Sequence, residues 1–212
     1  MGRTLDPVCK KCRREGMKLF LKGTRCDSPK CPIERRQGVL PGMHGYRRPK
    51  VGEYGMRLRE KQRLKRFYGL FEQQFRRFFT IAARSKQNTG EVLLSLMERR
   101  LDNVIHRLGF ASSRPAARQV VSHGHVTVNG QFCNIPSRLL KPGDTIAVKT
   151  HKRSVDLVRH NLGETPPPLP DYLEVVSTDP PAARLTRLPT RGDVDPRIAE
   201  IREQLIIEFV SR

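Results

Sequence analysis

The sequence contains no tryptophan, few aromatic residues of any kind and no long apolar run. Its 212 residues are 6 % aromatic and 37 % hydrophobic, which is lean for a globular protein. No segment approaches the run of about 18 apolar residues that a membrane helix needs. The first residues, Met1 to Asp6, lack the apolar core of a secretory signal. We therefore expect a protein that neither spans a membrane nor is secreted.

Acidic residues are also scarce. The chain has 21 Asp plus Glu against 41 Lys plus Arg, a formal net charge of +20. Residues 1–160 hold 35 basic and 12 acidic side chains, whereas residues 161–212 hold 6 and 9. Each Lys or Arg near a phosphate releases counterions on binding. The excess charge therefore favours a nucleic-acid partner over a protein that is basic without binding a polyanion.

Cysteine is rare, yet four of the five cysteines have metal-ligand spacing. Two residues separate Cys9 from Cys12, and four separate Cys26 from Cys31. Two such hooks joined by a loop suit a tetrahedral ion, so we expect one structural Zn²⁺ held by all four thiolates. Metal ligation also supplies folding free energy that a segment of about 40 residues lacks. Cys133 stands alone in an apolar run and is expected to be a buried small hydrophobe.

Other uses of the cysteine pairs compete with zinc. A disulfide framework is disfavoured because we expect the chain to stay inside the cell, where thiols remain reduced. A redox pair belongs between a strand and a helix, and too few residues precede Cys9 to form a strand. An iron–sulfur cluster takes the same ligands and stays open as an alternative.

Residues 53–85 have helical periodicity. Apolar side chains recur every three or four positions, at Leu64, Phe67, Phe71, Phe75, Phe78 and Ala82. This spacing predicts one helix with a core-facing stripe, in preference to a platform on which bases stack. Basic side chains fill much of the remaining surface, and Glu60 and Glu72 are the only acids between residues 57 and 85. With so few acidic partners, we expect the basic face to bind phosphates.

The middle of the chain predicts a compact module of two helices followed by three short strands. The first helix covers residues 89–108, and the second covers residues 114–122 after a Ser113 cap. Asn129-Gly130 predicts a type I′ hairpin turn between two strands. Residues 145–148 form the third strand, after a turn that contains proline and glycine.

The last quarter of the chain differs in composition. Residues 161–212 contain 8 of the 16 prolines, which favours extended backbone lying on other surfaces over a packed domain. Asp195-Pro196 predicts a helix start, and isoleucines at helical spacing follow it. We therefore expect a short C-terminal helix that packs on the body.

The middle module resembles the αL RNA-binding domain, in which two helices and a small strand layer form one basic edge. A linked series of motifs carries the likeness: Glu98-Arg99-Arg100-Leu101-Asp102-Asn103-Val104, Arg107-Leu108-Gly109-Phe110, Ser113-Arg114, Ala117-Arg118-Gln119, His123-Gly124-His125, Val128-Asn129-Gly130 and Gly143-Asp144. Further motifs extend it over the rest of the chain: Glu34-Arg35-Arg36, Pro41-Gly42-Met43-His44-Gly45, Glu53-Tyr54-Gly55, Leu58-Arg59-Glu60-Lys61-Gln62 and Glu208-Phe209-Val210-Ser211-Arg212. With the cysteine pairs, the whole chain is similar to the bacterial-type small-subunit ribosomal protein S-four family.

The expected fold class is α+β, a mostly helical body with a four-cysteine zinc knob and an inserted S-four-type RNA-binding domain. That domain has two helices and a small antiparallel strand layer. The expected divisions are a zinc-binding basic knob, a basic helical region, the RNA-binding domain, and a proline-rich acidic segment with the C-terminal helix, at residues 1–45, 46–88, 89–155 and 156–212.

The resemblance implies a function in the cytoplasmic ribosome. Proteins of this family bind small-subunit ribosomal RNA early in assembly at a multi-helix junction in its 5′ domain, and some repress their own messenger. They touch the neighbouring small-subunit protein S-five, at a surface linked to translational accuracy. Basic residues matching Arg47, Arg48 and Lys50 line the path by which messenger RNA enters the ribosome. Members occur with and without the four cysteines, and this chain has all four.

The candidate RNA-binding residues are basic or hydrogen-bonding side chains of the first 125 residues. They are Arg13, Arg14, Lys22, Arg25, Arg35, Arg36, Arg47, Arg48, Lys50, Arg57, Arg59, Lys61, Arg63, Arg66, Arg76, Arg84, Arg99, Arg107, Ser113, Arg114, Arg118, His123 and His125. Those on the two helices of the module are expected to clamp phosphates, aided by the Ser113 hydroxyl. The two histidines flank a glycine and are either phosphate donors or merely solvated. Arg100 and Asp102 are expected to pair with each other or with core groups.

Two other classes of function compete with ribosomal RNA binding. A zinc-containing DNA- or RNA-binding regulator is the first, but the charge is spread along about 150 residues instead of one recognition helix. The second is an RNA-modifying enzyme, because such enzymes also carry αL modules. No phosphate loop, paired carboxylates or nucleophile–base signature is present, and no room remains for a catalytic domain. We expect neither an enzyme nor a small-molecule substrate.

Overall fold

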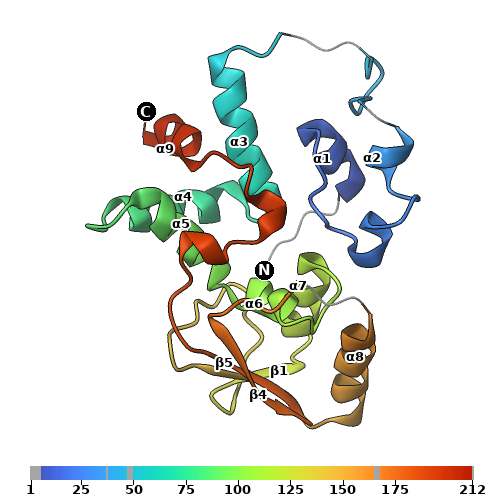
Figure 1. Ribbon diagram of the computed structural model, residues 1–212, viewed down its shortest axis with the longest axis vertical. Helices are drawn as coiled ribbons and strands as arrows, with labels where there is room; N and C mark the ends of the chain where they lie inside the picture. Colours follow the sequence, from blue (N-terminus) through green and yellow to red (C-terminus); the bar gives the residue numbers. More distant parts are fainter. Residues whose placement is uncertain (1–5, 37, 47–49, 165–167, 212) are drawn as a thin grey trace. The chain divides into compact units, whose positions relative to one another are not determined.

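The computed structural model describes residues 6–36, 38–46, 50–164 and 168–211 (Figure 1). The chain divides into two compact units, one formed by Met1–Leu93 with Asp195–Arg212 and the other by Leu94–Val194. The chain therefore leaves the first unit, completes the second and returns to the first.

Short helices and turns form the start of the first unit. They are α1 (Val8–Glu15), the 3₁₀ helix η1 (Gly23–Cys26) and α2 (Pro32–Arg35). Pro32 occupies the first position of α2, where its missing N–H costs no hydrogen bond. Leu19 and Leu21 are buried, as are three of the cysteines, so this segment has only a small apolar centre.

Helices α3 (Glu53–Phe67) and α4 (Glu72–Ala83) continue the first unit. The expectation of one helix over residues 53–85 is wrong, because Gly69 adopts a left-handed φ of 65° and the N–H of Leu70 bonds back to the carbonyl of Lys65 at 2.9 Å. Such a glycine termination closes a helix. The expected apolar stripe is confirmed as buried except at Phe71, which is 39 % exposed at the start of α4.

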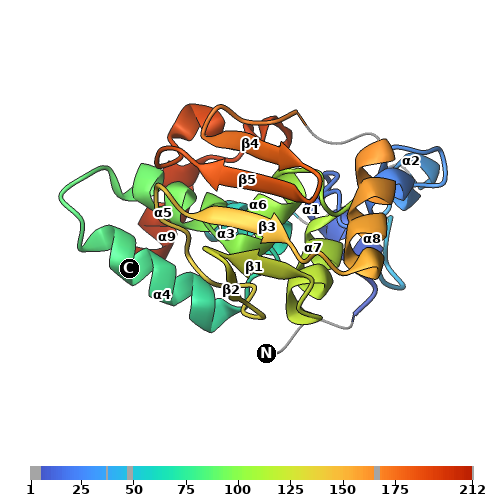
Figure 2. The ribbon, with the colours of Figure 1, turned by 90° about the horizontal axis from the view of Figure 1, so that it is seen from below.

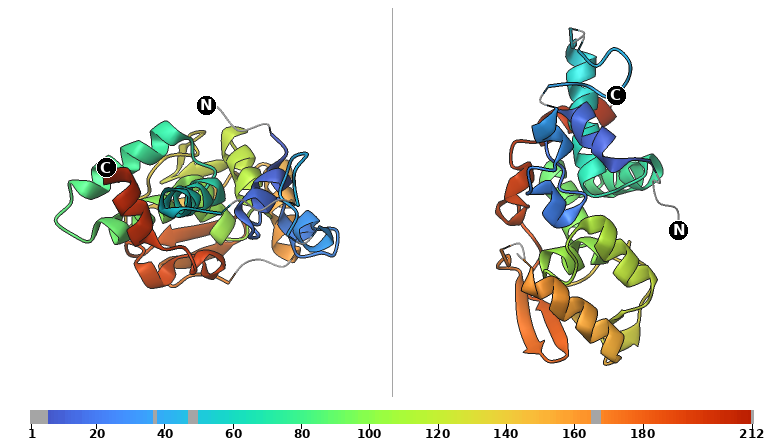
Figure 3. Two further views of the ribbon diagram at one scale, coloured as in Figure 1. Left: turned by 90° about the horizontal axis from the view of Figure 1, so that it is seen from above. Right: turned by 90° about the vertical axis from the view of Figure 1, so that its right-hand side faces the viewer.

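The C-terminal segment also lies in the first unit. The expected C-terminal helix is present as α9 (Glu203–Ser211), but it begins later than predicted, because the residues after Asp195 form a 3₁₀ turn, η3 (Pro196–Ile198). Helix α9 lies beside α3 (Figures 1 and 3), where Arg57 Nε approaches a Glu208 oxygen at 3.1 Å. The Tyr54 and Phe209 rings are 5.2 Å apart in the same contact.

The second unit combines helices with one antiparallel sheet. Helix α5 (Thr89–Glu98) leads into it, and its other elements are α6 (Leu101–Arg107), α7 (Arg114–Ser122), β1 (Val126–Val128), β2 (Gln131–Phe132), β3 (Thr145–Val148), α8 (Lys152–Gly163), β4 (Leu173–Thr178), β5 (Pro181–Leu185) and η2 (Arg191–Asp193). The strand order is β2-β1-β3-β5-β4, visible in Figure 2. Apolar side chains of α6, α7 and the strands form one buried core.

Local signals predicted much of this unit. Ser113 caps α7 by accepting the N–H of Ala116 at 3.3 Å. The turn between β1 and β2 has φ values of 53° at Asn129 and 76° at Gly130, which confirms the type I′ hairpin. Cys133 is buried in the core, as expected.

Three features of this unit were not predicted. The expected helix over residues 89–108 breaks before Leu101, whose N–H bonds to the carbonyl of Arg138 at 2.9 Å. Helix α8 was missed. The proline-rich segment supplies β4 and β5, so the sheet has five strands, and Ala183 and Leu185 of β5 lie in the core.

Candidate RNA interface and cysteine site

The four cysteines of the predicted metal site converge. Cys9, Cys12, Cys26 and Cys31 line one small space of about 10 Å³, together with Lys22, Arg25, Pro32 and Ile33. Three of the four thiols are buried, and the backbone N–H of Lys22 points at Cys26 Sγ from 3.4 Å. The two hooks therefore meet, as their spacing requires.

The chemistry of this space suits a soft cation. Burial raises the pKa of the Cys12 thiol to about 11, and the neighbouring cysteines add to the rise. Four thiolates cannot share so small a space unless a cation neutralises them. Among the described residues, no group of three or more His, Cys, Asp or Glu side chains is arranged as a metal shell. The donor set fits zinc in type and number, whereas a closed ligand geometry is not present.

The basic face of α3 has acidic partners from outside the helix. The buried carboxylate of Glu15 accepts a hydrogen bond from Arg59 at 3.1 Å and also pairs with Arg66. Arg63 donates to the Glu15 carbonyl at 3.2 Å and pairs with Glu60. The expectation that this face lacks acidic partners is therefore wrong for these arginines, because Glu15 is brought there by α1.

The outer residues of α3 are paired too. Lys61 is buried and lies 2.6 Å from Glu72, whose second oxygen is 2.9 Å from Lys65. Although burial opposes it, these two ammonium groups lower the pKa of Glu72 to about 2. Arg57 is engaged by α9, as described above. The candidate residues of α3 thus form ion pairs and hydrogen bonds inside the first unit.

Other candidate residues of the first unit face solvent. Exposed cations are Arg14, Lys22, Arg25, Arg35, Arg36, Lys50, Arg76 and Arg84. Arg76 has a side chain 73 % exposed, and its Nε lies 3.5 Å from a Glu72 oxygen. Arg13 is half-buried, and its guanidinium donates to the carbonyls of Val39 and Leu40 at 3.1 and 2.9 Å. Arg47 and Arg48 lie outside the described residues.

A cavity of about 710 Å³ opens in the first unit. Its basic lining consists of Arg13, Arg14, Arg36, Lys50, Arg59 and Arg63. Apolar side chains from the loop before α3 and from α3 itself form part of the remaining wall. The cavity gathers side chains that the sequence spreads over 50 residues, so no sequence pattern points to it.

Two predicted phosphate clamps of the second unit are buried. Arg107 is 4 % exposed and Arg114 is 5 % exposed. Arg114 Nε donates to Asn103 Oδ1 at 2.8 Å, and Arg107 donates to the Asp193 carbonyl at 2.9 Å. These guanidiniums belong to an internal network, which indicates a positioning role, and their direct contact with RNA stays a prediction.

The centre of that network is the buried carboxylate of Glu98. It accepts hydrogen bonds from Asn103 Nδ2 at 2.7 Å and from the Tyr172 hydroxyl at 3.1 Å. Arg107 Nε lies 3.9 Å from the same oxygen. Because Tyr172 comes from the segment before β4, the network ties the proline-rich segment to α5 and α6.

The expected pairing of Arg100 with Asp102 is confirmed. Arg100 Nη2 lies 2.6 Å from Asp102 Oδ2, and both side chains are buried. Half-buried Arg118 approaches the same carboxylate at 3.7 Å. Ser113 is buried at its cap. These groups set the geometry of the helix pair.

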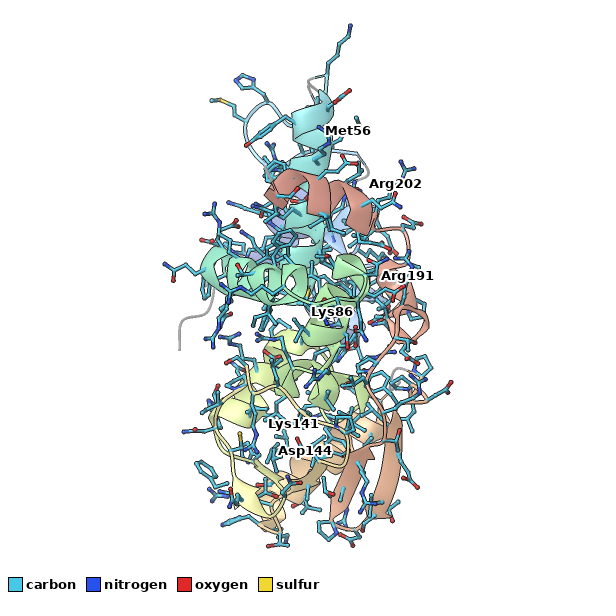
Figure 4. The ribbon with its side chains drawn as sticks, turned by 90° about the vertical axis from the view of Figure 1, so that its left-hand side faces the viewer. Met56, Lys86, Lys141, Asp144, Arg191 and Arg202 are labelled. Atoms are coloured by element: carbon cyan, nitrogen blue, oxygen red, sulfur yellow. The ribbon has the colours of Figure 1, made fainter. Side chains whose placement is uncertain are left out.

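The exposed basic edge of the second unit lies on its loops and strand ends. Arg99 is half-buried and donates to the Leu140 carbonyl at 2.8 Å. The turn that follows Leu140 contains Lys141 and Asp144, which Figure 4 labels. The Lys141 N–H fixes this turn because it donates to the Asp144 carboxylate at 2.8 Å. Strand alternation also places Lys149 on the outer face of the sheet. The candidate set omitted Lys141 and Lys149, although strand and turn signals surrounded both.

The predicted histidines lie at the corner between α7 and β1. His123 is exposed, and its ring centroid is 6.3 Å from that of half-buried His125. His125 Nδ1 lies 2.9 Å from the Ser154 hydroxyl. Burial lowers the pKa of His125, and the nearby His123, Lys149 and His151 lower it further. This corner is electropositive.

No helix among the described residues combines the length and apolarity that a membrane crossing requires.

Comparisons with known proteins cover the whole chain. Residues 3–98 match the model of the ribosomal protein S4/S9 N-terminal domain, and residues 99–146 match that of the S4 domain. Small ribosomal subunit protein uS4 of Thermoanaerobacter sp. (strain X514) is 53 % identical over 212 residues, with both chains fully covered. The protein of that name from Thermus thermophilus is 48 % identical over 213 residues, and protein uS4A of Symbiobacterium thermophilum is 49 % identical over 214, again with both chains fully covered.

Proposed function

The chain belongs to the uS4 family of small ribosomal subunit proteins, and from this premise we propose that it grips a multi-helix junction in the 5′ domain of small-subunit ribosomal RNA. Proteins of this family are structural components of the cytoplasmic ribosome and not enzymes, and the S4 domain binds ribosomal RNA. The observation that carries the proposal is the distribution of exposed cations over both units, on a chain with a net charge of +20.

Folded RNA suits such a surface. A-form helices present phosphates and a shallow minor groove, so recognition depends on shape and charge more than on base edges. Cations spread over loops, α4 and the outer side of the sheet can contact several RNA helices at once, which a junction offers and a single duplex does not.

Hydroxyl-radical footprinting of the 5′-domain RNA tests the proposal. Protections gathered where several RNA helices meet are the expected result. Protections spread evenly along all helices, or none at concentrations that saturate the protein, would contradict junction recognition.

We also propose that Cys9, Cys12, Cys26 and Cys31 hold one structural Zn²⁺. Four sulfur donors in one small buried space support this assignment, and the neighbouring Lys22 and Arg25 offset the negative charge of a zinc–thiolate centre. Zinc would then fold a segment whose apolar centre is small. Metal analysis of the purified protein is expected to give about one zinc per chain. Iron with visible absorbance would indicate a cluster instead, and no metal would overturn the proposal.

Two further partners are proposed from the resemblance: the neighbouring small-subunit protein S-five and messenger RNA on its path into the ribosome. Exposed Lys50, next to Arg47 and Arg48, supports the messenger contact through its charge. Cross-linking from a photoreactive group at position 50 in assembled subunits tests it. Cross-links to messenger are expected, and cross-links only to ribosomal RNA would contradict it.

A further inference from the structure

A large aromatic side chain lies on the outer face of the sheet. Phe132 pairs with Thr127 across the hairpin, whereas Val126 and Val128 of the same strand as Thr127 are fully buried. Side chains alternate between the two faces of a strand, so Phe132 shares the face of Thr127, away from the core. Its side chain is 57 % exposed. Core packing therefore does not account for this phenylalanine.

Two contacts hold the ring in place. Lys149 Nζ lies 4.3 Å from the ring centroid, a cation–π distance. The backbone of Gly124 approaches the ring so closely that a Cβ there would lie 2.5 Å from a Phe132 ring carbon. Gly124 also has a φ of 75°, which other residues rarely adopt. Lys149 and Gly124 thus hold the exposed ring in place, and the glycine leaves the space that the ring occupies.

Hydrogen-bond donors come from the two neighbours in sequence of the glycine that contacts the ring. His123 and His125 flank Gly124, and the Lys149 N–H bonds to the His125 carbonyl at 2.9 Å. The contact between His125 Nδ1 and Ser154 fixes the imidazole on one side. An exposed aromatic face beside cations is the combination that binds a nucleobase and its phosphate together.

We propose that Phe132 stacks against an unpaired base of the ribosomal RNA while Lys149 and the two histidines contact the adjoining phosphate. This inference rests on the proposed function, since it assigns to the RNA-binding surface one site that takes a base extruded from a helix. Such a site adds a contact that depends on RNA structure, whereas the other contacts of the surface depend on charge. The other cations contact any polyanion, but the ring requires a base.

The absence of tryptophan from the sequence allows a direct test. In the full-length Phe132→Trp variant the indole is the only one, and stacking on a base quenches its fluorescence. Titration with 5′-domain RNA is expected to give quenching that saturates together with binding measured independently. The matched control is Val176→Trp in β4, an exposed position (52 %) at the opposite edge of the sheet, where little quenching is expected.

Affinity supplies a second readout. Stacking contributes about 1–3 kcal/mol per base, so Phe132→Leu is expected to weaken RNA binding about 5- to 150-fold, while Val176→Leu leaves it unchanged. Heparin, which has charge but no bases, is expected to bind without quenching. RNA binding with a silent indole and an unaffected Phe132→Leu variant overturns the stacking site alone. Equal quenching by heparin also overturns it, and failure of the wild-type protein to bind RNA overturns the proposed function as well.

Discussion

Arg59 Nη1 donates a hydrogen bond to Glu15 Oε1 at 3.1 Å, across 44 positions of the sequence. Arg66 reaches the same buried oxygen. One carboxylate from α1 therefore neutralises charge on α3 and ties the cysteine-bearing segment to it. Arg59 and Arg66 therefore hold the protein together, whereas cations such as Arg84 are exposed.

The first prediction follows from that separation. Glu15→Gln is expected to lower the free energy of unfolding by about 1–3 kcal/mol, because the hydrogen bonds to two arginines lose the negative charge of their acceptor. The decisive measurement is urea unfolding. Arg84→Glu, at an exposed position of the same unit, is the contrasting variant. We expect it to leave the free energy of unfolding unchanged and to reduce the affinity for RNA. The salt dependence of RNA binding should become shallower, with a slope smaller by about one. A reversed pattern would contradict the assignment.

A second prediction concerns the network around Glu98. Tyr172→Phe removes the hydroxyl that donates to this carboxylate, and is expected to cost about 1–2 kcal/mol of stability. The salt slope of RNA binding should not change, since the tyrosine is buried. Thermal unfolding and a binding series at several salt concentrations check both parts. A changed slope with unaltered stability would mean that the network contacts RNA directly.

A third prediction concerns how the stability of the fold depends on pH. The Arg187 guanidinium and the N–H and hydroxyl of Thr190 hold the pKa of Asp193 at about 2, below its usual 3.8. A carboxyl group whose pKa is lower in the folded state stabilises the fold at every pH above its unfolded-state pKa. That stabilisation disappears as the pH falls through the folded-state pKa. The stability difference between wild type and Asp193→Asn should therefore be full at pH 6 and shrink below about pH 4. A difference independent of pH would refute the linkage.

Metal removal gives the fourth prediction. A strong chelator, or Cys26→Ser, is expected to open residues 6–45 to proteolysis while the second unit stays resistant, because the proposed zinc would hold only the cysteine segment. Cys133→Ala, which changes a core cysteine, is the control and should keep the metal. Limited proteolysis with mass spectrometry measures the cleavage of the cysteine segment and the resistance of the second unit. An N-terminal segment equally resistant with and without metal would contradict a structural zinc.

The elements predicted correctly are those whose cause is local. The Ser113 cap and the Asn129-Gly130 turn depend on a few neighbouring residues, and the apolar stripe of α3 and α4 on helical spacing. The break before Leu101 depends on a hydrogen bond to Arg138, and β5 on pairing with β3, neither of which a sequence window contains. Fold class was therefore predictable, whereas the extent of the sheet was not.

The candidate site divides in the same way. The cysteine spacing predicted that the four side chains meet. The basic residues were predicted as one class, because charge alone does not distinguish the buried Arg107 and Arg114 from exposed Arg84. Phe132 was missed because an aromatic residue in a strand ordinarily indicates core, and only the register with Thr127 shows which face it occupies.

The exposed cations of both units are proposed to recognise folded ribosomal RNA and not polyanions in general. Filter binding of labelled 5′-domain RNA, with duplex DNA and unstructured RNA as competitors over a salt series, tests it most directly. We expect tight binding that survives both competitors at moderate salt. Equal competition by all three polyanions would contradict it.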